Sequence, residues 1–386
     1  MVALIEHQAK ALLATSGLPV PRGWVVRDSG RPAAAVADVP ATARFAVKAQ
    51  VPAKNRAAVG GVVLVDTRAE AEEAARRLLG GRIHGHPVNS VLIEEAIEIA
   101  AEWFLCVLVD PWQGGLTVQC SDQGGSGVEG RLAGGAGTTY SFQPSGVPDG
   151  DTLARAWGWT ADPLRRRIAD LAADLCRLAV AYDLLLLEIN PLGVTPGGDL
   201  VVLDAHISVD DAAEFRQPWF AALEEELDIV HPGRAWRRRY GGDFAVTDGD
   251  GTVALLNTGA GAGMLLMDQF GERGITTYDF SDIRAGTPGR RPERFRAAVE
   301  LILQGHAVDT VLICIHAGIT DLREVGTDLV ETVDALGTAG RNVVVRLQGP
   351  YSAEASERFA GLPRTVVEPE LQRAVDAVVE LTGRAS

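Results

Sequence analysis

The stretch LLLLEINPLGVTPGGDLVVLDAHISVDD contains two apolar runs, and the first carries Glu188 and Asn190 while the second carries Asp204 and His206. Its two β-favouring runs are joined by a Thr-Pro-Gly-Gly turn, which predicts an antiparallel hairpin centred near Gly197. In that register Asn190 lies opposite Asp204, and Glu188 lies opposite His206. Side chains alternate between the faces of a strand, so Glu188 and Asn190 share one face. The hairpin therefore predicts one polar cluster on an otherwise apolar ribbon.

An acid and an amide at cross-strand spacing suit a hard divalent cation. Cross-strand Cβ atoms lie roughly 5 Å apart, and Mg²⁺ is usually held by one or two carboxylates together with phosphate oxygens and water. Another interpretation is that Asn190 and Asp204 satisfy hydrogen bonds of the turn or of a sheet edge. Glu188 favours the metal site, because burying a carboxylate without a partner costs too much free energy to be kept without a role.

Basic residues near the start of the chain indicate what would accompany such a cation. Lys48 lies inside the apolar strand AVKAQV. A lysine at such a position either prevents an exposed edge strand from pairing with another chain or extends toward a phosphate group. The following loop, PAKNRAAVGG, adds Lys54, Arg56 and two glycines. Together with the acid–amide pair, these cations suggest a nucleoside triphosphate with Mg²⁺. Glu94 and Glu102 are candidates to accept hydrogen bonds from adenine or ribose, although isolated acids of this kind are more often solvated.

Two glycine-containing turns, NTGAGAG and IHAGITD, occur in the second half of the chain. Each follows a strand and opens a helix, where free backbone N–H groups and the helix dipole favour an anion. Either turn alone is equally typical of tight packing between a helix and a sheet. Two of them at the carboxyl ends of strands in one open sheet predict a shared anion site. A third stretch, DQGGSGVEGRLAGGAG, is either a flexible linker or a loop that covers a ligand.

The elements that position these groups divide the chain in two. Residues 1–235 mix strands and helices around an antiparallel sheet, an α+β pattern. Residues 251–386 alternate short β-rich runs with helical segments, which is typical of βαβ units and a parallel sheet. Residues 236–250, in the Arg-rich stretch HPGRAWRRRYGGDFAVTDGDG, are expected to be a linker. The run RAWRRRY is interpreted as a solvated linker or a partner-facing patch rather than a binding motif. The predicted fold class is α/β, with an α+β nucleotide-binding domain followed by a parallel-sheet domain.

The amino-acid composition limits which partners the protein is expected to bind and in which cellular compartment it is expected to be found. The chain has 386 residues, enough for two or three domains, and is 47% hydrophobic and 23% charged, as in ordinary globular proteins. Its net charge of −15 argues against nucleic acid and against an anionic membrane as partner. The four scattered cysteines are expected to be buried thiols in a reducing cytosol. No window is long and apolar enough to span a bilayer, so the expected location is the cytoplasm.

Four segments, taken in order, form a specific combination: EHQAKALLATSGLPVPRG, EINPL, GDLVVLDA and FRQP. With the glycine turns that follow, they resemble the β subunit of succinyl-CoA synthetase, an ATP-grasp acid–CoA ligase, from end to end. The resemblance implies an N-terminal ATP-grasp fold and a C-terminal flavodoxin-like CoA-ligase domain. Such enzymes convert a carboxylic acid, CoA and a nucleoside triphosphate into acyl-CoA, nucleoside diphosphate and phosphate. An acyl phosphate forms, and a phosphohistidine of the α subunit carries the phosphoryl group. The CoA site also lies mainly on α, so an α-like partner is implied.

The resemblance assigns roles to individual positions. Asn190 and Asp204 match Mg²⁺ ligands, and Glu188 matches a glutamate that stabilises the phosphohistidine when it visits the nucleotide site. His206 stands where the family has a lysine, beside the expected metal, and is a second candidate catalytic residue. The implied contacts are Lys48, Asn55, Arg56 and Ala57 for the ATP phosphates, Glu94, Ile97 and Glu102 for the base and ribose, and Asn257, Thr258, Gly318, Ile319 and Thr320 for the substrate.

The phosphate loop departs from the family pattern. Lys54, Asn55 and Ala57 replace glycines, and Ala58 replaces a lysine. Loss of glycines stiffens the loop and limits the approach of its backbone to phosphates. We therefore expect weaker or altered nucleotide binding.

The turns that the resemblance assigns to the substrate also differ from the family pattern. Thr258 takes the position of a substrate-contacting asparagine, although Asn257 is adjacent. The segment SDIRAG, residues 281–286, replaces a glycine triplet, and Ala317 replaces another glycine. Because several of these positions lie on the carboxylate side, we expect an acid or acyl acceptor different from that of the family.

The leading hypothesis is an ADP-forming acid–thiol ligase of this type that acts with an α-like partner. A second hypothesis is an ATP-grasp ligase that joins its acyl phosphate to an amine. A third is a catalytically weakened subunit kept as a structural or regulatory partner, which the altered phosphate loop supports. Joint retention of Lys48, Glu188, Asn190 and Asp204 argues against this third hypothesis.

Overall fold

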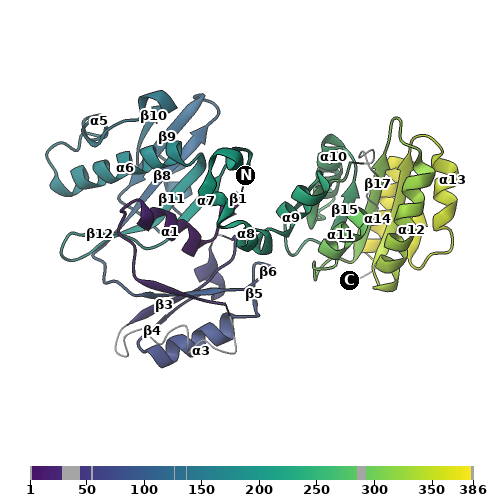
Figure 1. The fold of residues 1–386 in the computed structure, drawn as a ribbon, viewed down its shortest axis with the longest axis horizontal. Helices are drawn as coiled ribbons and strands as arrows, with labels where there is room; N and C mark the ends of the chain where they lie inside the picture. The colour runs from purple at the N-terminus through teal and green to yellow at the C-terminus, as the bar shows by residue number, and fades with distance from the viewer. Residues whose placement is uncertain are drawn as a thin grey trace. The chain divides into compact units, whose positions relative to one another are not determined.

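The computed structural model describes residues 2–27, 44–53, 55–125, 127–135, 137–284 and 293–383. The chain forms two compact units, Met1–Glu224 (unit 1) and Glu225–Ser386 (unit 2) (Figure 1). Unit 1 combines helices with antiparallel sheets and unit 2 is built on a parallel sheet, which confirms the predicted fold class. Within the described ranges, no helix is long and apolar enough to cross a membrane.

A seven-stranded antiparallel sheet forms the larger part of unit 1. Its strand order is β1-β13-β11-β8-β9-β10, and β12 pairs with β11 beside this path. The strands are β1 (Val2–Leu4), β8 (Ala101–Asp110), β9 (Gly115–Ser121), β10 (Thr138–Phe142), β11 (Leu184–Val194), β12 (Leu200–Val202) and β13 (Ala205–Val209). The helices of this part are α1 (Glu6–Thr15), α4 (Val128–Ala133), α5 (Gly150–Ala156), α6 (Pro163–Ala181) and α7 (Pro218–Ala221).

Helix α6 shows how the sequence sets one of these elements. The Asp162 side chain accepts hydrogen bonds from the N–H groups of Leu164 and Arg165, so it caps the helix start. Apolar residues at helical spacing, among them Ile168 and Leu175, then form a buried stripe. This stripe packs on β8 and β11, and it thereby supports the strands that carry the polar hairpin residues.

The hairpin has the predicted register. Strand β11 runs antiparallel to β13 and places Glu188 opposite His206. The backbone N–H of Asn190 donates to the carbonyl of Asp204 over 3.1 Å. The pairing expected from the Pro-Gly-Gly turn is therefore confirmed.

A four-stranded antiparallel sheet, β2-β7-β3-β4, forms the other part of unit 1. Its strands are β2 (Gly23–Val26), β3 (Phe45–Ala49), β4 (Val62–Val65) and β7 (Val91–Glu95), and a small ladder joins β5 (Arg82–Ile83) to β6 (His86–Pro87). Helix α3 (Arg68–Leu78) begins with a capping box between Thr67 and Glu70 and buries Ala71 and Ala75 against this sheet. The short helix η1 (Arg56–Val59) lies between β3 and β4 and forms the phosphate loop of the sequence prediction.

A four-stranded parallel sheet, β15-β17-β18-β19, forms the centre of unit 2. The strands are β15 (Val253–Asn257), β17 (Thr310–His316), β18 (Asn342–Gln348) and β19 (Thr365–Val367), and an antiparallel ladder joins β14 (Asp243–Val246) to β16 (Asp279–Asp282). The helices are α8 (Glu224–Val230), α9 (Pro232–Tyr240), α10 (Ala260–Gly271), α11 (Glu293–Ile302), α12 (Leu322–Thr338), α13 (Ser352–Ser356) and α14 (Leu371–Thr382).

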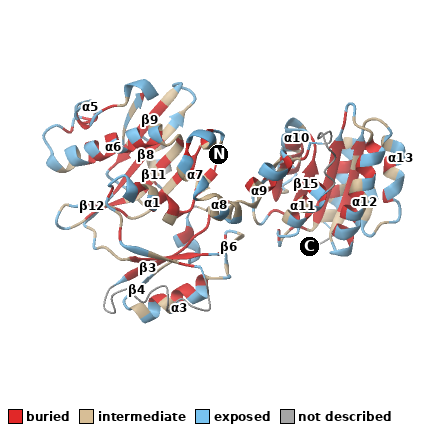
Figure 2. Ribbon diagram, viewed as in Figure 1, coloured by how far each residue is buried: buried red, intermediate tan, exposed pale blue. Residues whose placement is uncertain are grey.

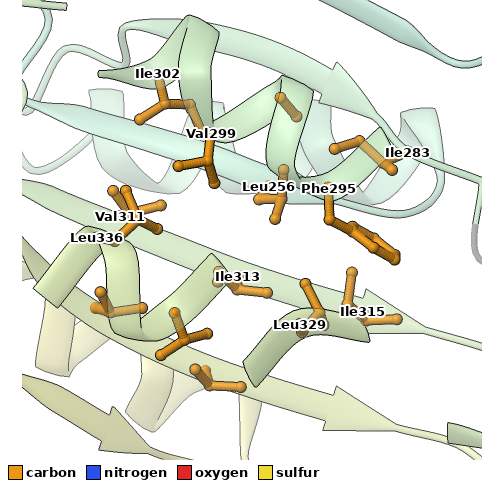
Figure 3. Close-up of a cluster of buried hydrophobic side chains, with 14 of the residues drawn as sticks. Leu256, Ile283, Phe295, Val299, Ile302, Val311, Ile313, Ile315, Leu329 and Leu336 are labelled. Carbon is orange, nitrogen blue, oxygen red and sulfur yellow. The ribbon is translucent and has the colours of Figure 1, made fainter. Parts of the chain in front are cut away.

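Helices cover both faces of this parallel sheet, so its central strands are buried (Figure 2). On one face, Phe295 of α11 and Leu329 of α12 pack in a cluster with Leu256 and Ile313 (Figure 3). On the other face, residues of α10 and α14 pack with the alternate strand positions, among them Leu255. Burial on both faces explains the unbroken apolar runs that predicted parallel strands.

Residues 236–250 differ from the expected linker, because they contain the end of α9 and the whole of β14. Trp236 and Tyr240 are four residues apart on one helix face, and they belong with Phe244 to the core of unit 2. Because arginines surround Trp236 and Tyr240 in the sequence, the segment appears polar and its apolar helix face is not evident. The division between the compact units lies earlier, between Glu224 and Glu225.

Candidate nucleotide and metal site

A cavity of about 530 Å³ lies within unit 1. It is lined from the small sheet by β3, η1 and β7, and from the large sheet by β11 and β13. Every unit 1 residue to which the family resemblance assigned a role lines it: Lys48, Asn55, Arg56, Ala57, Glu94, Ile97, Glu102, Glu188, Asn190, Asp204 and His206. The structure therefore brings together side chains that span more than 150 positions of the chain, as the numbers of Lys48 and His206 show.

The hairpin turns one polar face to this cavity. Glu188 and Asn190 are half-buried and line the cavity, while the alternate residues Leu187 and Ile189 are completely buried. This alternation follows from the period of two along a strand. The predicted polar cluster is thus present on the cavity face.

Asn190 ties the glycine-rich loop to the hairpin. Its Oδ1 accepts a hydrogen bond of 2.7 Å from the N–H of Gly125. In the same loop, the N–H of Gly124 donates to the carbonyl of Glu102 over 3.0 Å. A Cβ at Gly124 would lie 2.7 Å from the carbonyl oxygen of Trp103, so this close backbone approach requires glycine. The loop therefore contributes to the cavity wall at Gly125.

Six charged groups form a buried cluster beside the hairpin. This charge cluster consists of the acids Glu6, Glu94 and Asp204 and the bases Lys10, Lys48 and Arg56. Lys48 Nζ lies 2.7 Å from Glu6 Oε1, 2.8 Å from Glu94 Oε2 and 2.7 Å from the carbonyl oxygen of Leu203. An ammonium group has three hydrogens, so these three oxygens use its donor capacity.

Arg56 joins the phosphate loop to the hairpin. Its Nη2 lies 2.7 Å from Glu6 Oε2, and 3.0 and 3.1 Å from the two carboxylate oxygens of Asp204. Its Nη1 donates to the carbonyl of Ala49 over 2.8 Å. The guanidinium is thus held by two acids and one backbone carbonyl.

The charge cluster shifts the titration of its members. Burial opposes ionisation of Glu6, but the surrounding charges of Lys10, Lys48 and Arg56 outweigh it and hold the pKa of Glu6 well below its usual value. Burial also opposes the charge of Lys48, but the neighbouring acids, Glu6 first, raise the pKa of Lys48 above its usual value. Burial and the negative charge of Glu6 raise the pKa of Asp204, against the opposing effect of Arg56.

The donor set suits magnesium. Asp204 offers a carboxylate whose side chain is 38% exposed to the cavity, and Asn190 offers an amide oxygen on the same cavity wall. No group of three or more His, Cys, Asp or Glu side chains that could enclose a metal ion occurs in the described part of the chain. Mg²⁺ does not need such a cage, because phosphate oxygens and water complete its coordination.

The substrate candidates of unit 2 lie at the carboxyl ends of β15 and β17, which are parallel neighbours. Thr258 Oγ1 donates to the carbonyl of His316 over 2.9 Å and accepts from the His316 N–H over 2.7 Å. Asn257 is completely buried, and its Nδ2 donates to the carbonyl of Ser281. Gly318 and Ile319 are exposed, Ile319 to 97%, and Thr320 is half-buried. The side chain of Asn257 is thus used inside unit 2 rather than displayed at the turn.

The segment that replaces the glycine triplet contacts the start of α10. Asp282 Oδ1 accepts a hydrogen bond of 2.8 Å from the N–H of Gly259, directly before the first residue of the helix. A carboxylate of the chain itself therefore occupies one of the N–H groups that the glycine turn was expected to offer to an anion. Ala285 and Gly286 of the same segment, and Lys54 of the phosphate loop, lie outside the described residues.

Two members of the charge cluster were missed in the sequence, Glu6 and Lys10. They lie four residues apart in α1, and Lys10 Nζ is 2.9 Å from Glu6 Oε1. The segment EHQAK holds the signal, because an acid and a lysine at that spacing face the same side of a helix. Their contacts with Lys48, Arg56 and Glu94 are distant in sequence and carry no local pattern.

Comparisons with known proteins agree with the geometry. A family model described as an ATP-grasp domain matches residues 3–134. The ADP-forming succinate–CoA ligase β subunit of Alkalilimnicola ehrlichii is 31% identical over 398 residues, covering 99% of this chain and 100% of that protein. The GDP-forming succinate–CoA ligase β subunit of Thermus thermophilus is also 31% identical, again over 99% and 100% of the two chains.

A solved structure shows the same fold. The structure of ATP citrate lyase from Methanothrix soehngenii, in complex with citrate and coenzyme A, covers 98% of this chain and 99% of its own. The TM-score is 0.65 and the sequence identity is 19%. At that identity the similarity concerns the fold alone.

Proposed function

The chain belongs to the succinate–CoA ligase β-subunit family, and from that premise we propose that it binds the nucleotide in an ATP-dependent acid–CoA ligase. Family membership and the ATP-grasp domain make it a ligase. The proposed reaction joins a carboxylic acid to CoA, with ATP converted to ADP and phosphate. An acyl phosphate is the intermediate, and a phosphohistidine on an α-like partner carries the phosphoryl group.

The observation that carries this proposal is the wall of the unit 1 cavity. Lys48 and Arg56 lie on one side of it, and the acid–amide pair Asp204 and Asn190 lies on the hairpin side. Arg56 Nη2 is 3.0 Å from Asp204 Oδ2, so one of the two cations is in direct contact with the hairpin acid. The cations can bind a polyphosphate, and the acid–amide pair can bind its Mg²⁺ in the same cavity.

In this proposal Lys48 and Arg56 bind the phosphates, and Ile97, Glu94 and Glu102 line the space for the base and ribose. Because Lys48 already has three protein acceptors, its contact with phosphate requires exchange of one of them. Asp204 and Asn190 would hold Mg²⁺, which when bound would neutralise charge on the phosphates.

Glu188 and His206 lie side by side across the hairpin and face the same cavity. We assign to Glu188 the binding of the partner's phosphohistidine at the nucleotide site, because a carboxylate can accept the N–H of an imidazole ring. His206 stands next to this group and is proposed to contact the phosphoryl group in transfer.

The proposal places the acid substrate at the turns of unit 2, at Thr258 and Gly318–Thr320. The Asp282 carboxylate bonded to Gly259 N–H adds a negative charge there. Because like charges repel, this arrangement favours an acid other than the dianion succinate.

Isothermal titration of the purified chain with ATP and with GTP, each in MgCl₂, tests the nucleotide site. We expect saturable binding of at least one of the two. Absence of binding to both would instead favour the hypothesis of a catalytically weakened subunit.

The ligase reaction is tested with the co-purified partner by a screen of carboxylic acids for CoA-dependent ADP release. A phosphohistidine detected on the partner supports the CoA ligase, whereas amine-dependent ADP release without CoA supports the amide-forming alternative.

A further inference from the structure

Glu6 is a buried acid that connects two cations from different elements. It lies in the first turn of α1 with 3% of its surface exposed. Its Oε1 is 2.7 Å from Lys48 Nζ on β3, and its Oε2 is 2.7 Å from Arg56 Nη2 at the start of η1. Each carboxylate oxygen therefore holds one of the two cations proposed to bind phosphate. Glu6 also lines the same cavity.

Stability alone gives no reason for such an arrangement. Taking charges out of water is costly, and buried ion pairs are often no more stabilising than apolar residues of similar volume. Leu13 of the same helix is completely buried, so α1 also packs through apolar side chains. The carboxylate is explained instead by what it does to Lys48 and Arg56.

Two cations on one cavity wall repel each other, and both have long side chains with many rotamers. A carboxylate between them removes the repulsion and selects one conformation of each. Groups that are held in place before a ligand arrives lose less conformational entropy when it binds. Glu6 thus provides a physical means of keeping two positive charges side by side.

Lys10 completes the charge balance from outside the cavity wall. Its Nζ lies 2.9 Å from Glu6 Oε1 and 2.7 Å from Glu94 Oε1, so it contacts two acids of the cluster. It is absent from the described residues that line the cavity. Without Lys10 the cluster would hold three acids and two bases, and the excess negative charge would oppose an incoming polyphosphate.

We propose that Glu6 is a positioning residue for nucleotide phosphates, which holds the Lys48 ammonium and the Arg56 guanidinium together, and that Lys10 offsets the remaining acid. This inference rests on the proposed function, since it requires a nucleoside triphosphate in the unit 1 cavity. Glu6 acts through the two cations, because its Oε1 contacts Lys48 and its Oε2 contacts Arg56. Replacing Glu6 should therefore weaken the binding of ligands that carry phosphate groups and leave the binding of ligands without phosphate nearly unchanged.

The test compares MgATP with adenosine, which has no phosphate, on the full chain. In Glu6→Gln the dissociation constant of MgATP should rise about tenfold or more, because one partner of buried ion pairs is removed. The dissociation constant of adenosine, measured by competition or ligand-observed NMR, should change by less than about twofold. Glu70→Gln, in the exposed capping box of α3, is the matched control and should leave both constants unchanged.

A double-mutant cycle with Arg56→Met separates positioning from a general structural defect. If Glu6 acts through Arg56, the loss of MgATP affinity in the double variant should be clearly smaller than the sum of the two single losses. Additive losses, or equal losses for MgATP and adenosine, would overturn the inference.

A second variant covers the case in which Glu6→Gln does not fold. Glu6→Gln with Lys10→Met removes one acid and one base and keeps the cluster neutral. It should still lose MgATP affinity selectively, and unchanged MgATP affinity in the folded double variant would contradict the positioning role. If the wild-type chain binds no MgATP, the proposed function fails and the inference fails with it. Binding by the wild type without a selective loss in the variants removes only the inference.

Discussion

Arg56 Nη2 lies 3.0 Å from Asp204 Oδ2 and 3.1 Å from Asp204 Oδ1, so an ion pair joins the segment that follows β3 to the hairpin that carries Asn190 and Asp204. The guanidinium contacts the carboxylate that we propose as a metal ligand. A metal ion and Arg56 must therefore share or exchange Asp204. Nucleotide phosphates offer Arg56 another acceptor, which couples the binding of metal to the binding of nucleotide.

Replacing Arg56 by methionine tests this coupling. We expect the affinity of the chain for Mn²⁺ without nucleotide to increase by about threefold to tenfold, because Asp204 loses a competing cation. The affinity for MgATP should fall in the same variant. Titration of free Mn²⁺ by electron paramagnetic resonance gives the first quantity and calorimetry the second. Unchanged or weaker Mn²⁺ binding in Arg56→Met would show that the ion pair does not control access to Asp204.

The glycine-rich loop should depend on the absence of a side chain at Gly124. In Gly124→Ala the added Cβ would lie 2.7 Å from the carbonyl oxygen of Trp103, so the backbone must shift. We expect a loss of stability of about 1–3 kcal/mol and faster proteolysis of the loop. Gly130→Ala, in the nearby helix α4, is the control, because an added Cβ there meets no atom within 4 Å. Thermal unfolding and limited trypsinolysis measure both effects, and equal behaviour of the two variants would refute the close approach.

Asp279 should make the stability of unit 2 depend on pH. It is completely buried on β16, its Oδ1 accepts from the N–H of Leu255, and burial raises its pKa well above the usual value. A raised pKa in the folded state stabilises the protein below the unfolded pKa of about 3.9, and this contribution is lost as pH rises toward the folded value. Asp279→Asn keeps an acceptor and has no charge, so it should be more stable than the wild type at alkaline pH by roughly 1–3 kcal/mol.

Hydrogen exchange of the β15 amides, measured from acid to alkaline pH, follows this effect in unit 2. The difference between the wild type and Asp279→Asn should shrink as the pH falls. A difference that is constant across the pH range would contradict the titration of Asp279.

Local chemistry was enough to predict some elements and contacts. The Pro-Gly-Gly turn and the period of two predicted that Glu188 lies opposite His206, and the structure has that pair. The apolar runs of the parallel strands were predicted for the same reason, since neighbouring residues decide them. Lys48, Arg56 and the acid–amide pair were grouped from their chemistry. Asn55, Ala57 and Ile97 were assigned to the site only through the family resemblance.

Contacts between distant segments escaped prediction. Glu6 reads as a surface acid of an amphipathic helix, and only packing of α1 against the hairpin brings it to Lys48 and Arg56. Asn257 reads as a turn residue, but β16 covers it and its side chain bonds to Ser281. Trp236 and Tyr240 form an apolar face that the neighbouring arginines conceal, so the segment was interpreted as a linker.

The central claim is that the hairpin carboxylate and amide hold Mg²⁺ under the phosphates of a nucleotide in unit 1. Calorimetric titration of ATP into wild type and Asp204→Asn, each in MgCl₂ and in EDTA, tests it most directly. We expect the wild type to bind ATP at least about tenfold more tightly with Mg²⁺, and Asp204→Asn to fold normally and lose that difference. Metal-dependent turnover should then be absent from Asp204→Asn in the presence of the partner. An equal Mg²⁺ dependence in the two proteins, or no ATP binding by the wild type, would contradict the account.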